Sequence, residues 1–164
     1  PRHYIVRSSW VVGDGRNFVG TMKGLSDRCA DPGDALDRVT VVDDQLGRLT
    51  FTRDMAEGIL WLLGYRLGDV EPSSPAPHGA YDLTGSGPVE SWAQIAARVF
   101  DLANGNGERV VPVSTAEYYA SAGGPVAPRP EHSALDLSKI RAAGYAPRDW
   151  TESLSEYLEH LCSR

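Results

Sequence analysis

Apolar positions follow two different periods along this chain, and the alternation between them predicts strands followed by helices. Residues 4–12 are rich in β-branched and aromatic side chains and end at a glycine turn, which is typical of a strand. Shorter runs of the same kind predict strands at 39–42, 80–84 and 110–113. Strands that alternate with helices indicate an α/β fold.

Apolar residues spaced three or four positions apart predict the helices. Asn17 is expected to begin a helix of about three turns, which Asp31-Pro32 ends, and Ser91 is expected to cap another. Thr50 or Thr52 is the expected cap of a third. The helices after the first are expected over residues 52–63, 92–102, 135–142 and 150–161. Pro, Gly and Ser in 68–77 and 120–130 indicate irregular loops.

Composition narrows the class of protein. The 164 residues are 41% apolar and 23% charged, which suits one folded domain. The net charge is -6 and the basic residues are scattered, so we expect no nucleic-acid partner. No apolar run approaches the ~20 residues of a membrane span, so we expect no membrane association. Cys29 and Cys162 are expected to be free thiols in a reducing cytoplasm.

The chain holds no recognisable catalytic apparatus. Gly13-Asp14-Gly15 follows a strand, but the next glycine is Gly20, so the spacing of a dinucleotide loop fails and a turn is the better interpretation. No tyrosine has a lysine four residues later, which removes the proton-transfer pair of short-chain dehydrogenases. The four histidines lack metal-ligand spacing. We therefore expect no catalytic, metal-binding or cofactor-binding residues here.

Three residues suggest ligand binding, each with a plainer alternative. Arg129 lies between Pro128 and Pro130, and a guanidinium on such a stiff backbone suits a phosphate. Asn17 begins a helix whose free N–H groups could accept an anion, and Trp10 could be a sugar platform. A surface arginine, an N-cap and a core tryptophan are the alternatives, and the residues alone favour them.

Five segments resemble the dTDP-4-dehydrorhamnose reductase family in order and spacing over nearly the whole chain. They are R-S-S-W-V-V-G at 7–13, N-F-V-G-T-M at 17–22, V-V-D-D-Q-L-G-R-L-T-F-T-R-D-M-A at 41–56, Y-D-L-T-G with S-W at 81–92, and R-P-E-H-S with Leu135 and Lys139 at 129–139. Val12 stands where the family has Tyr, and Leu49 where it has Pro, which leaves the exact sugar nucleotide open.

The resemblance implies an extended short-chain dehydrogenase that reduces dTDP-4-dehydro-β-L-rhamnose to dTDP-L-rhamnose with NADPH, in the cytoplasm, for cell-surface polysaccharide. Mg²⁺ is also compatible with it. In that family the phosphate loop and the catalytic Tyr and Lys lie upstream of the segments matched here. Residues 1–164 are therefore expected to be the C-terminal, substrate-binding part, without the N-terminal Rossmann strands and inactive alone.

The resemblance also implies roles for individual residues. Trp10 would lie against the deoxysugar, and Asn17 and Arg129 would contact the pyrophosphate. Arg48 or Thr50 would approach the nucleotide. These residues would bind and orient the ligand, and none would transfer the proton.

By the same resemblance, the strands at about 4–9 and 80–84 belong to the sheet of the cofactor domain. The strands at 39–42 and 110–113 would form a small sheet of the substrate lobe. Because unpaired strand edges expose backbone groups, the first pair is expected to bond to each other, to a second copy in a homodimer, or to the N-terminal half.

Two other functions stay open. One is a non-catalytic sugar-nucleotide-binding or regulatory module of the same superfamily. The other is a different activity, such as that of an epimerase, or the role of a methionine-adenosyltransferase regulator, with which the D-D-Q-x-G stretch is shared.

Overall fold

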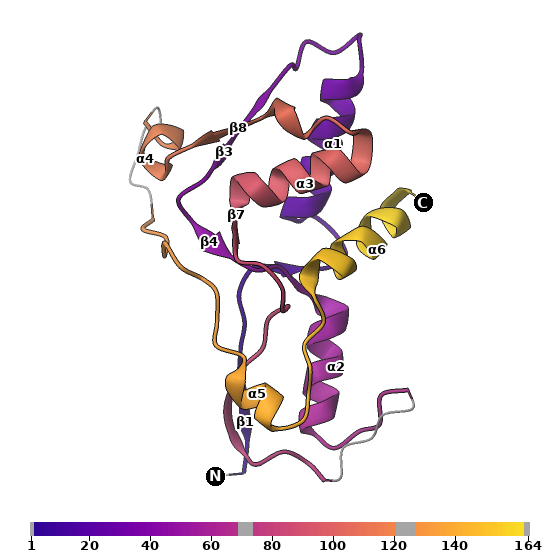
Figure 1. Cartoon of the computed structure of the whole chain (residues 1–164), viewed down its shortest axis with the longest axis vertical. Coiled ribbons are helices and arrows are strands. Elements are labelled where there is room, and N and C mark those ends of the chain that lie inside the picture. The colour runs from indigo at the N-terminus through magenta and orange to yellow at the C-terminus, as the bar shows by residue number, and fades with distance from the viewer. Residues whose placement is uncertain (1, 69–73, 121–126, 163–164) are drawn as a thin grey trace. The chain divides into compact units, whose positions relative to one another are not determined.

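The structure is a computed structural model that describes residues 2–68, 74–120 and 127–162, the last without its side chain. The chain forms two compact units (Figure 1). Unit 1 comprises Pro1–Gly13, Arg48–Pro88 and Ala134–Ser153, and unit 2 comprises Asp14–Gly47, Val89–Ser133 and Leu154–Arg164.

Strands and helices alternate, as the α/β prediction requires. The strands are β1 Tyr4–Arg7, β2 Val11–Val12, β3 Val39–Val42, β4 Leu46–Gly47, β5 Thr50–Phe51, β6 Gly79–Asp82, β7 Glu90–Ser91 and β8 Val110–Val113. The helices are α1 Phe18–Ala30, α2 Thr52–Leu62, α3 Trp92–Asn104, α4 Thr115–Tyr118, α5 Ser138–Ala142 and α6 Trp150–Cys162, with a 3₁₀ turn at Gly107–Arg109.

In unit 1, strands β1 and β6 pair in parallel, so the strands expected at about 4–9 and 80–84 bond to each other. Arg7 and Asp82 are register partners, and their side chains form an ion pair with an N–O distance of 2.8 Å. Helices α2 and α5 contribute to the apolar core that covers this sheet. The buried members of that core are Trp61, Leu62, Ala76, Tyr81, Leu83, Leu137, Ile140 and Tyr145.

Lys139 of α5 fastens the helix to this sheet. Its ammonium donates a hydrogen bond of 2.7 Å to the carbonyl of Ala80 and lies 4.6 Å from the centroid of the Tyr81 ring. A cation over an aromatic face is attracted by the ring quadrupole. The lysine of the fifth matched segment therefore has a structural role in unit 1.

The strand predicted at 4–12 is interrupted. β1 ends at Arg7 and β2 begins at Val11, because Trp10 between them has a positive φ of 48°. Among the described residues, Trp10 is the only one other than glycine with a positive φ. The strand predicted at 80–84 is also shorter, and ends at Asp82.

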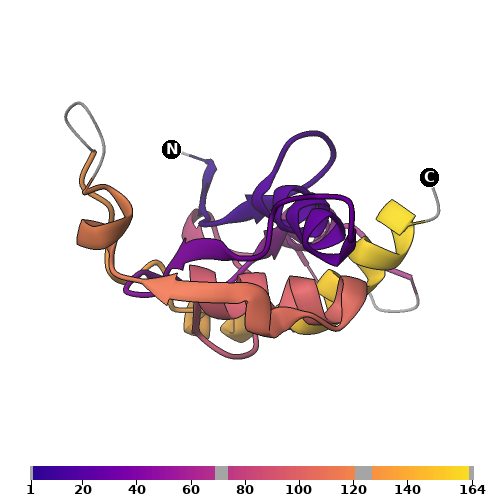
Figure 2. The ribbon, with the colours of Figure 1, turned by 90° about the horizontal axis from the view of Figure 1, so that it is seen from above.

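In unit 2, β3 and β8 form the predicted small parallel sheet, which Figure 2 shows side by side, with Val39 opposite Val110. Helix α3 packs against both strands and α1 packs against α3. The rings of Phe18 and Trp92 lie 4.5 Å apart, between centroids. Ser26 is fully buried in α1 and donates a hydrogen bond to the side chain of Asn106.

Two of the three predicted helix caps are confirmed. Asn17 caps α1, and Ser91 caps α3 in a reciprocal capping box with Gln94. The cap predicted for α2 is wrong, because Phe51 occupies that position and makes no side-chain cap. The short elements β4, β5, β7 and α4 were not predicted, since two to four residues are too few to show a period.

Helix α1 ends at Ala30, directly before Asp31-Pro32, as predicted. Helix α5 differs from prediction, because it begins at Ser138 rather than at residue 135. Cys29 is a buried free thiol, while the side chain of Cys162 lies outside the described residues, as do 69–73 and 121–126 of the predicted loops. None of the helices in the described part of the chain has both the length and the apolar character needed to span a bilayer.

Candidate functional site

Thr50 makes hydrogen bonds to the backbone of Ser9 and of Trp10, and all three residues belong to unit 1. The backbone N–H of Thr50 donates to the carbonyl of Trp10 at 3.0 Å, and its hydroxyl donates to the carbonyl of Ser9 at 2.8 Å. Trp10 is half-buried, whereas Thr50 is 1% exposed. Thr50 therefore offers a ligand almost no surface, and its hydroxyl is committed to the backbone beside Trp10.

Arg48 lies two residues before Thr50 and joins two loops of unit 1. Its Nε donates to the carbonyl of Gly87 at 3.0 Å, and one terminal nitrogen donates to the carbonyl of Leu135 at 3.4 Å. A guanidinium has five N–H donors. Arg48 can therefore hold these loops and still offer donors to a nucleotide.

In unit 2, the side chain of Asn17 uses both its oxygen and its amide nitrogen within the protein. Its Oδ1 accepts from the backbone N–H of Gly20 at 3.0 Å. Its Nδ2 donates to the carbonyl of Gly15 at 3.1 Å and to the hydroxyl of Tyr157 at 2.7 Å. Asn17 is thus an N-cap, and an anion at this end of α1 would meet the backbone N–H groups of the first turn.

Arg129 is exposed in an irregular segment of unit 2, and it has no hydrogen bond or ion pair within the described part of the chain. The residues that follow are fixed to β4. Leu46 donates to the carbonyl of Glu131 and accepts from the N–H of Ser133, both at 2.7 Å. A free guanidinium two residues from an anchored backbone is suited to an external anion.

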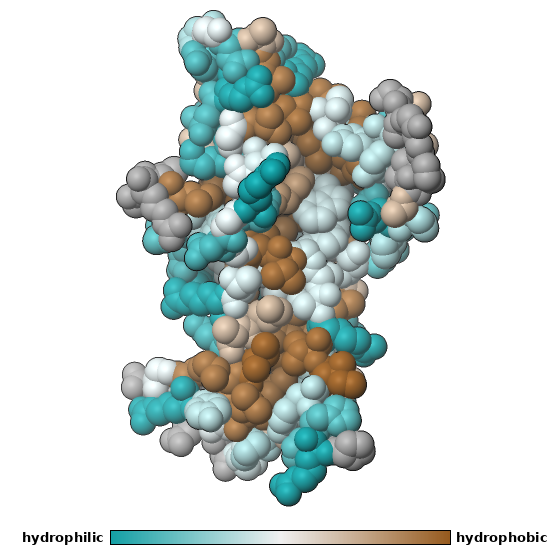
Figure 3. Space-filling view, turned by 180° about the vertical axis from the view of Figure 1, so that it is seen from behind, coloured by the Kyte–Doolittle hydropathy of each residue, from teal (hydrophilic) through white to brown (hydrophobic). Residues whose placement is uncertain are grey.

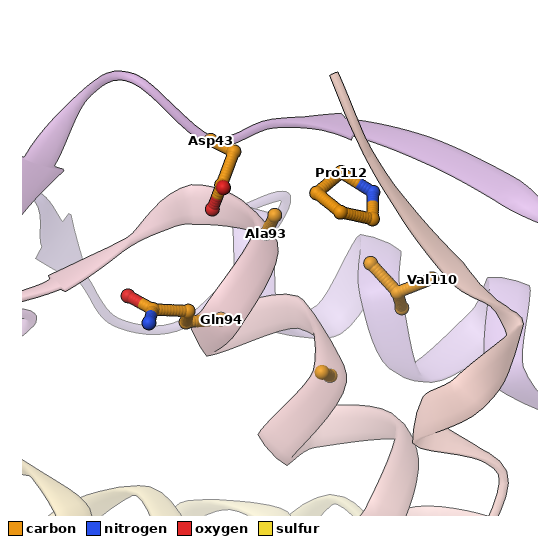
Figure 4. Close-up of a pocket in the computed structure, with 6 residues that line it drawn as sticks. Asp43, Ala93, Gln94, Val110 and Pro112 are labelled. Carbon is orange, nitrogen blue, oxygen red and sulfur yellow. The ribbon is translucent and has the colours of Figure 1, made fainter. Parts of the chain in front are cut away.

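An open pocket of about 260 Å³ lies elsewhere in unit 2, against the β3–β8 sheet (Figure 4). Its walls are mostly apolar. Its lining residues are Asp43, Ala93, Gln94, Ala97, Val110 and Pro112. Figure 4 shows the Asp43 carboxylate pointing from the end of β3 toward α3, and this carboxylate accepts a hydrogen bond from the hydroxyl of Ser91. None of the predicted site residues lines this pocket.

Next to Asp43, the carboxylate of Asp44 accepts from both the hydroxyl and the backbone N–H of Thr115. These hydrogen bonds favour the ionised form and lower the pKa of Asp44 below its usual value. Gln45 also donates to the Thr115 hydroxyl, at 2.9 Å. The D-D-Q stretch therefore fastens the start of α4 within unit 2.

The structure brings together only some of the predicted site residues. Trp10 and Thr50 are in contact, and Asn17 and Arg129 belong to the same unit, with no hydrogen bond between them in the described part of the chain. Tyr157, the partner of Asn17, was not predicted, because a tyrosine on an amphipathic helix gives no sign of its partner. The hydrogen bond between Thr50 and Ser9 was also not predicted, because the sequence gives no sign of which distant backbone group a threonine hydroxyl meets.

Metal and cofactor chemistry finds little support in the described residues. No three His, Cys, Asp or Glu side chains gather there as a metal site requires. Gly13–Gly15, which a dinucleotide loop would use, forms a bend before α1. Gly15 has a φ of 85°, and a Cβ at Gly13 would lie 2.6 Å from Cγ2 of Thr52. The described residues therefore offer no cluster of three such side chains to the Mg²⁺ that the resemblance permits.

Comparison with known proteins covers the chain almost from end to end. The model of the family described as RmlD substrate binding domain matches residues 1–163. A dTDP-4-dehydrorhamnose reductase of Streptomyces griseus is 37% identical over 163 residues, 98% of this chain and 48% of that protein. The spore coat polysaccharide biosynthesis protein SpsK of Bacillus subtilis (strain 168) is 34% identical over 160 residues, 97% of this chain and 48% of that protein.

Solved structures agree with these matches. A dTDP-4-dehydrorhamnose reductase of Clostridium acetobutylicum ATCC 824 superposes with a TM-score of 0.75 and 32% identity, over 96% of this chain and 48% of that one. The enzyme of Bacillus anthracis str. Ames, in complex with NADP, gives a TM-score of 0.73 and 28% identity, over 98% of this chain and 49% of that one. This chain thus spans about half the length of the relatives that it matches.

Proposed function

This chain belongs to the RmlD substrate binding domain family, and we propose that it is the substrate-binding part of an NADPH-dependent dTDP-4-dehydrorhamnose reductase. The complete enzyme would convert dTDP-4-dehydro-β-L-rhamnose to dTDP-L-rhamnose, a nucleotide sugar for cell-surface polysaccharide, in the cytoplasm. The observation that carries the proposal is the agreement, over 98% of the chain, with a relative that bears the reductase name.

Unit 2 is proposed to bind the pyrophosphate. The exposed guanidinium of Arg129 would donate to two phosphate oxygens, and charge-assisted bonds of this kind are stronger than neutral ones. The N-terminus of α1, held by Asn17, would add backbone N–H groups and the positive end of the helix dipole. Direct donation from the Asn17 amide would require it to leave Gly15 or Tyr157.

Unit 1 is proposed to contact the sugar and the nucleotide. Trp10 is half-buried and would present part of its ring to the deoxysugar, while Arg48 would offer its remaining donors to the nucleotide. Neither residue belongs to a Tyr-x-x-x-Lys pair, which this sequence lacks. Both would therefore bind and orient the ligand, which raises the rate by positioning.

Unit 1 is also proposed to dock onto a cofactor-binding half. The β1–β6 sheet has two strands, and each has one edge that pairs with no other described strand. Figure 3 shows apolar side chains gathered on the surface of unit 1. Ile5 on β1 is 51% exposed, and Leu60 and Leu63 at the end of α2 are also exposed. Further parallel strands and their helices would cover such a surface.

The chemistry would depend on that other half. This sequence has no Tyr-x-x-x-Lys pair and no dinucleotide loop, and so the chain alone is proposed to be inactive. NADPH, when bound to the complete enzyme, supplies the hydride.

Calorimetric titration of the chain with a panel of sugar nucleotides tests this function. dTDP-L-rhamnose should bind, and GDP-mannose should not. NADPH consumption with the keto sugar should be absent for the chain alone and present when a cofactor-binding half is supplied. Binding without any activity in the mixture would instead favour the non-catalytic module. A preference for another nucleotide would favour a different activity of the superfamily.

A further inference from the structure

The backbone of Trp10 adopts a conformation that its side chain disfavours. Its φ of 48° lies in the left-handed region, where the Cβ of an L-residue crowds the backbone. A conformation of this kind persists only when the surrounding structure enforces it. Some contact must therefore hold Trp10 in place.

Thr50 makes two hydrogen bonds that can enforce it. The carbonyl of Ser9, which accepts from the Thr50 hydroxyl at 2.8 Å, belongs to the peptide plane before the α-carbon of Trp10. The carbonyl of Trp10, which accepts from the Thr50 N–H at 3.0 Å, belongs to the plane after it. The relative orientation of these two planes is what φ and ψ of Trp10 describe. One residue thus fixes both planes.

Thr50 is itself firmly held. It lies opposite Val11 in the β2–β5 pair, and its side chain is 1% exposed. The side chains of Leu49 and Phe51 on either side are also buried. Since close-packed side chains seldom move independently, Thr50 can transmit the rigidity of the core to Trp10.

We propose that Thr50 is a positioning residue, whose hydroxyl holds the backbone of Trp10 so that the indole meets the sugar of the ligand. This role rests on the proposed function, in which Trp10 contacts the deoxysugar. Thr50 does not touch the ligand. Removal of the Thr50 hydroxyl should weaken recognition of the sugar and leave recognition of the nucleotide unchanged.

Calorimetry with two probes, dTDP and dTDP-L-rhamnose, tests the proposal on the 164-residue chain. Thr50→Val keeps the shape of the side chain but removes the donor. It should weaken dTDP-L-rhamnose about fivefold, the scale of one net hydrogen bond, and leave dTDP unchanged. Thr50→Ser keeps the donor and should bind both probes like the wild type. Thr40→Val, at an exposed position of β3, is the matched control and should change neither.

The outcomes separate this proposal from the proposed function. Equal weakening of both probes by Thr50→Val, or no weakening, overturns the positioning role. If the folded wild type binds neither probe, the proposed function fails, and a crystal structure of Thr50→Val then decides. Trp10 leaving the left-handed region supports the positioning role, and an unchanged φ and ring position overturn it.

A second variant covers the case in which Thr50→Val does not fold. Glycine accepts a positive φ without crowding, so Trp10→Gly removes the need for enforcement. The double variant Trp10→Gly/Thr50→Val should then recover a cooperative urea transition. Failure of the double variant to fold, while Trp10→Gly alone folds, would mean that the hydroxyl is needed elsewhere and would overturn the proposal.

Discussion

The hydroxyl of Tyr157 on α6 accepts a hydrogen bond from the side-chain amide of Asn17, with 2.7 Å between Nδ2 and the oxygen. These residues are 140 positions apart in the sequence. The bond orients the N-cap of α1, because the same amide group also accepts from Gly20. A residue of the terminal helix therefore helps to set the end of α1 at which an anion is proposed to bind.

Tyr157→Phe should lower the free energy of unfolding by about 1 kcal/mol, the net worth of one hydrogen bond. Urea denaturation followed by circular dichroism measures it. Tyr118→Phe is the control, since Tyr118 is 47% exposed and its hydroxyl has no hydrogen bond within the described residues. Equal transitions for Tyr157→Phe and wild type would show that the bond does not stabilise α1.

Arg129→Ala should weaken binding of dTDP by about 1.5–3 kcal/mol, the scale of a hydrogen bond to a charged group. Its unfolding free energy should stay within about 0.5 kcal/mol of the wild type, because Arg129 is an exposed surface residue. Calorimetric titration and urea denaturation measure the two quantities. Arg141→Ala, at an exposed position of α5, should change neither. An unchanged affinity for dTDP in Arg129→Ala would remove Arg129 from the proposed site.

Gly58→Ala should destabilise unit 1 by about 1–3 kcal/mol, as overpacking does in a filled core. A Cβ at Gly58 would lie 2.7 Å from Cδ2 of Leu83 and 3.0 Å from Cε1 of Tyr145. Gly24→Ala, on an open face of α1, should instead stabilise by about 0.5–1 kcal/mol. Thermal denaturation of both variants checks the contrast. Two shifts of the same sign would mean that Gly58 is not closely packed against Leu83 and Tyr145.

Alkaline pH should destabilise the chain partly through Tyr145. Burial, followed by the nearby carboxylates of Glu57 and Asp54, raises the pKa of Tyr145 to about 12. The unfolded chain releases this proton near pH 10, so between these values the unfolded state binds fewer protons and stability falls as pH rises. The contribution is fully present below about pH 10 and is lost toward pH 12.

Urea denaturation at a series of pH values from 8 to about 11 measures this slope. Tyr145→Phe should be less stable at pH 8, because the hydrogen bond from the Tyr145 hydroxyl to the carbonyl of Asp54 is lost. It should also lose less stability than the wild type as the pH rises. Parallel curves for the two proteins would mean that Tyr145 titrates normally in the folded state.

The sequence predicted the longer elements of the fold because their periods extend over several residues. Strands β3 and β8 and helix α3 begin where Val39, Val110 and the Ser91 cap predict. The break at Trp10 could not be predicted, since a left-handed tryptophan has no local signal and depends on Thr50, 40 positions away. The β2–β5 and β4–β7 pairs depend on contacts between distant segments in the same way.

The candidate site was less predictable than the fold. Resemblance to a family identified Trp10, Asn17, Arg48, Thr50 and Arg129, but not what each side chain contacts. Thr50 is buried against backbone rather than offered to a nucleotide, and the Asn17 amide is used within unit 2. Of these five residues, Arg129 alone has an exposed charge with no hydrogen bond or ion pair within the described residues. Its proposed role remains a prediction.

Titration of the purified chain with dTDP-L-rhamnose, and in parallel with thymidine, tests the central claim most directly. We expect saturable one-to-one binding of the sugar nucleotide and none of thymidine, because the diphosphate is the group that Arg129 and the N-terminus of α1 are proposed to bind. No binding of dTDP-L-rhamnose by the folded chain, or equal affinity for thymidine, would contradict the account.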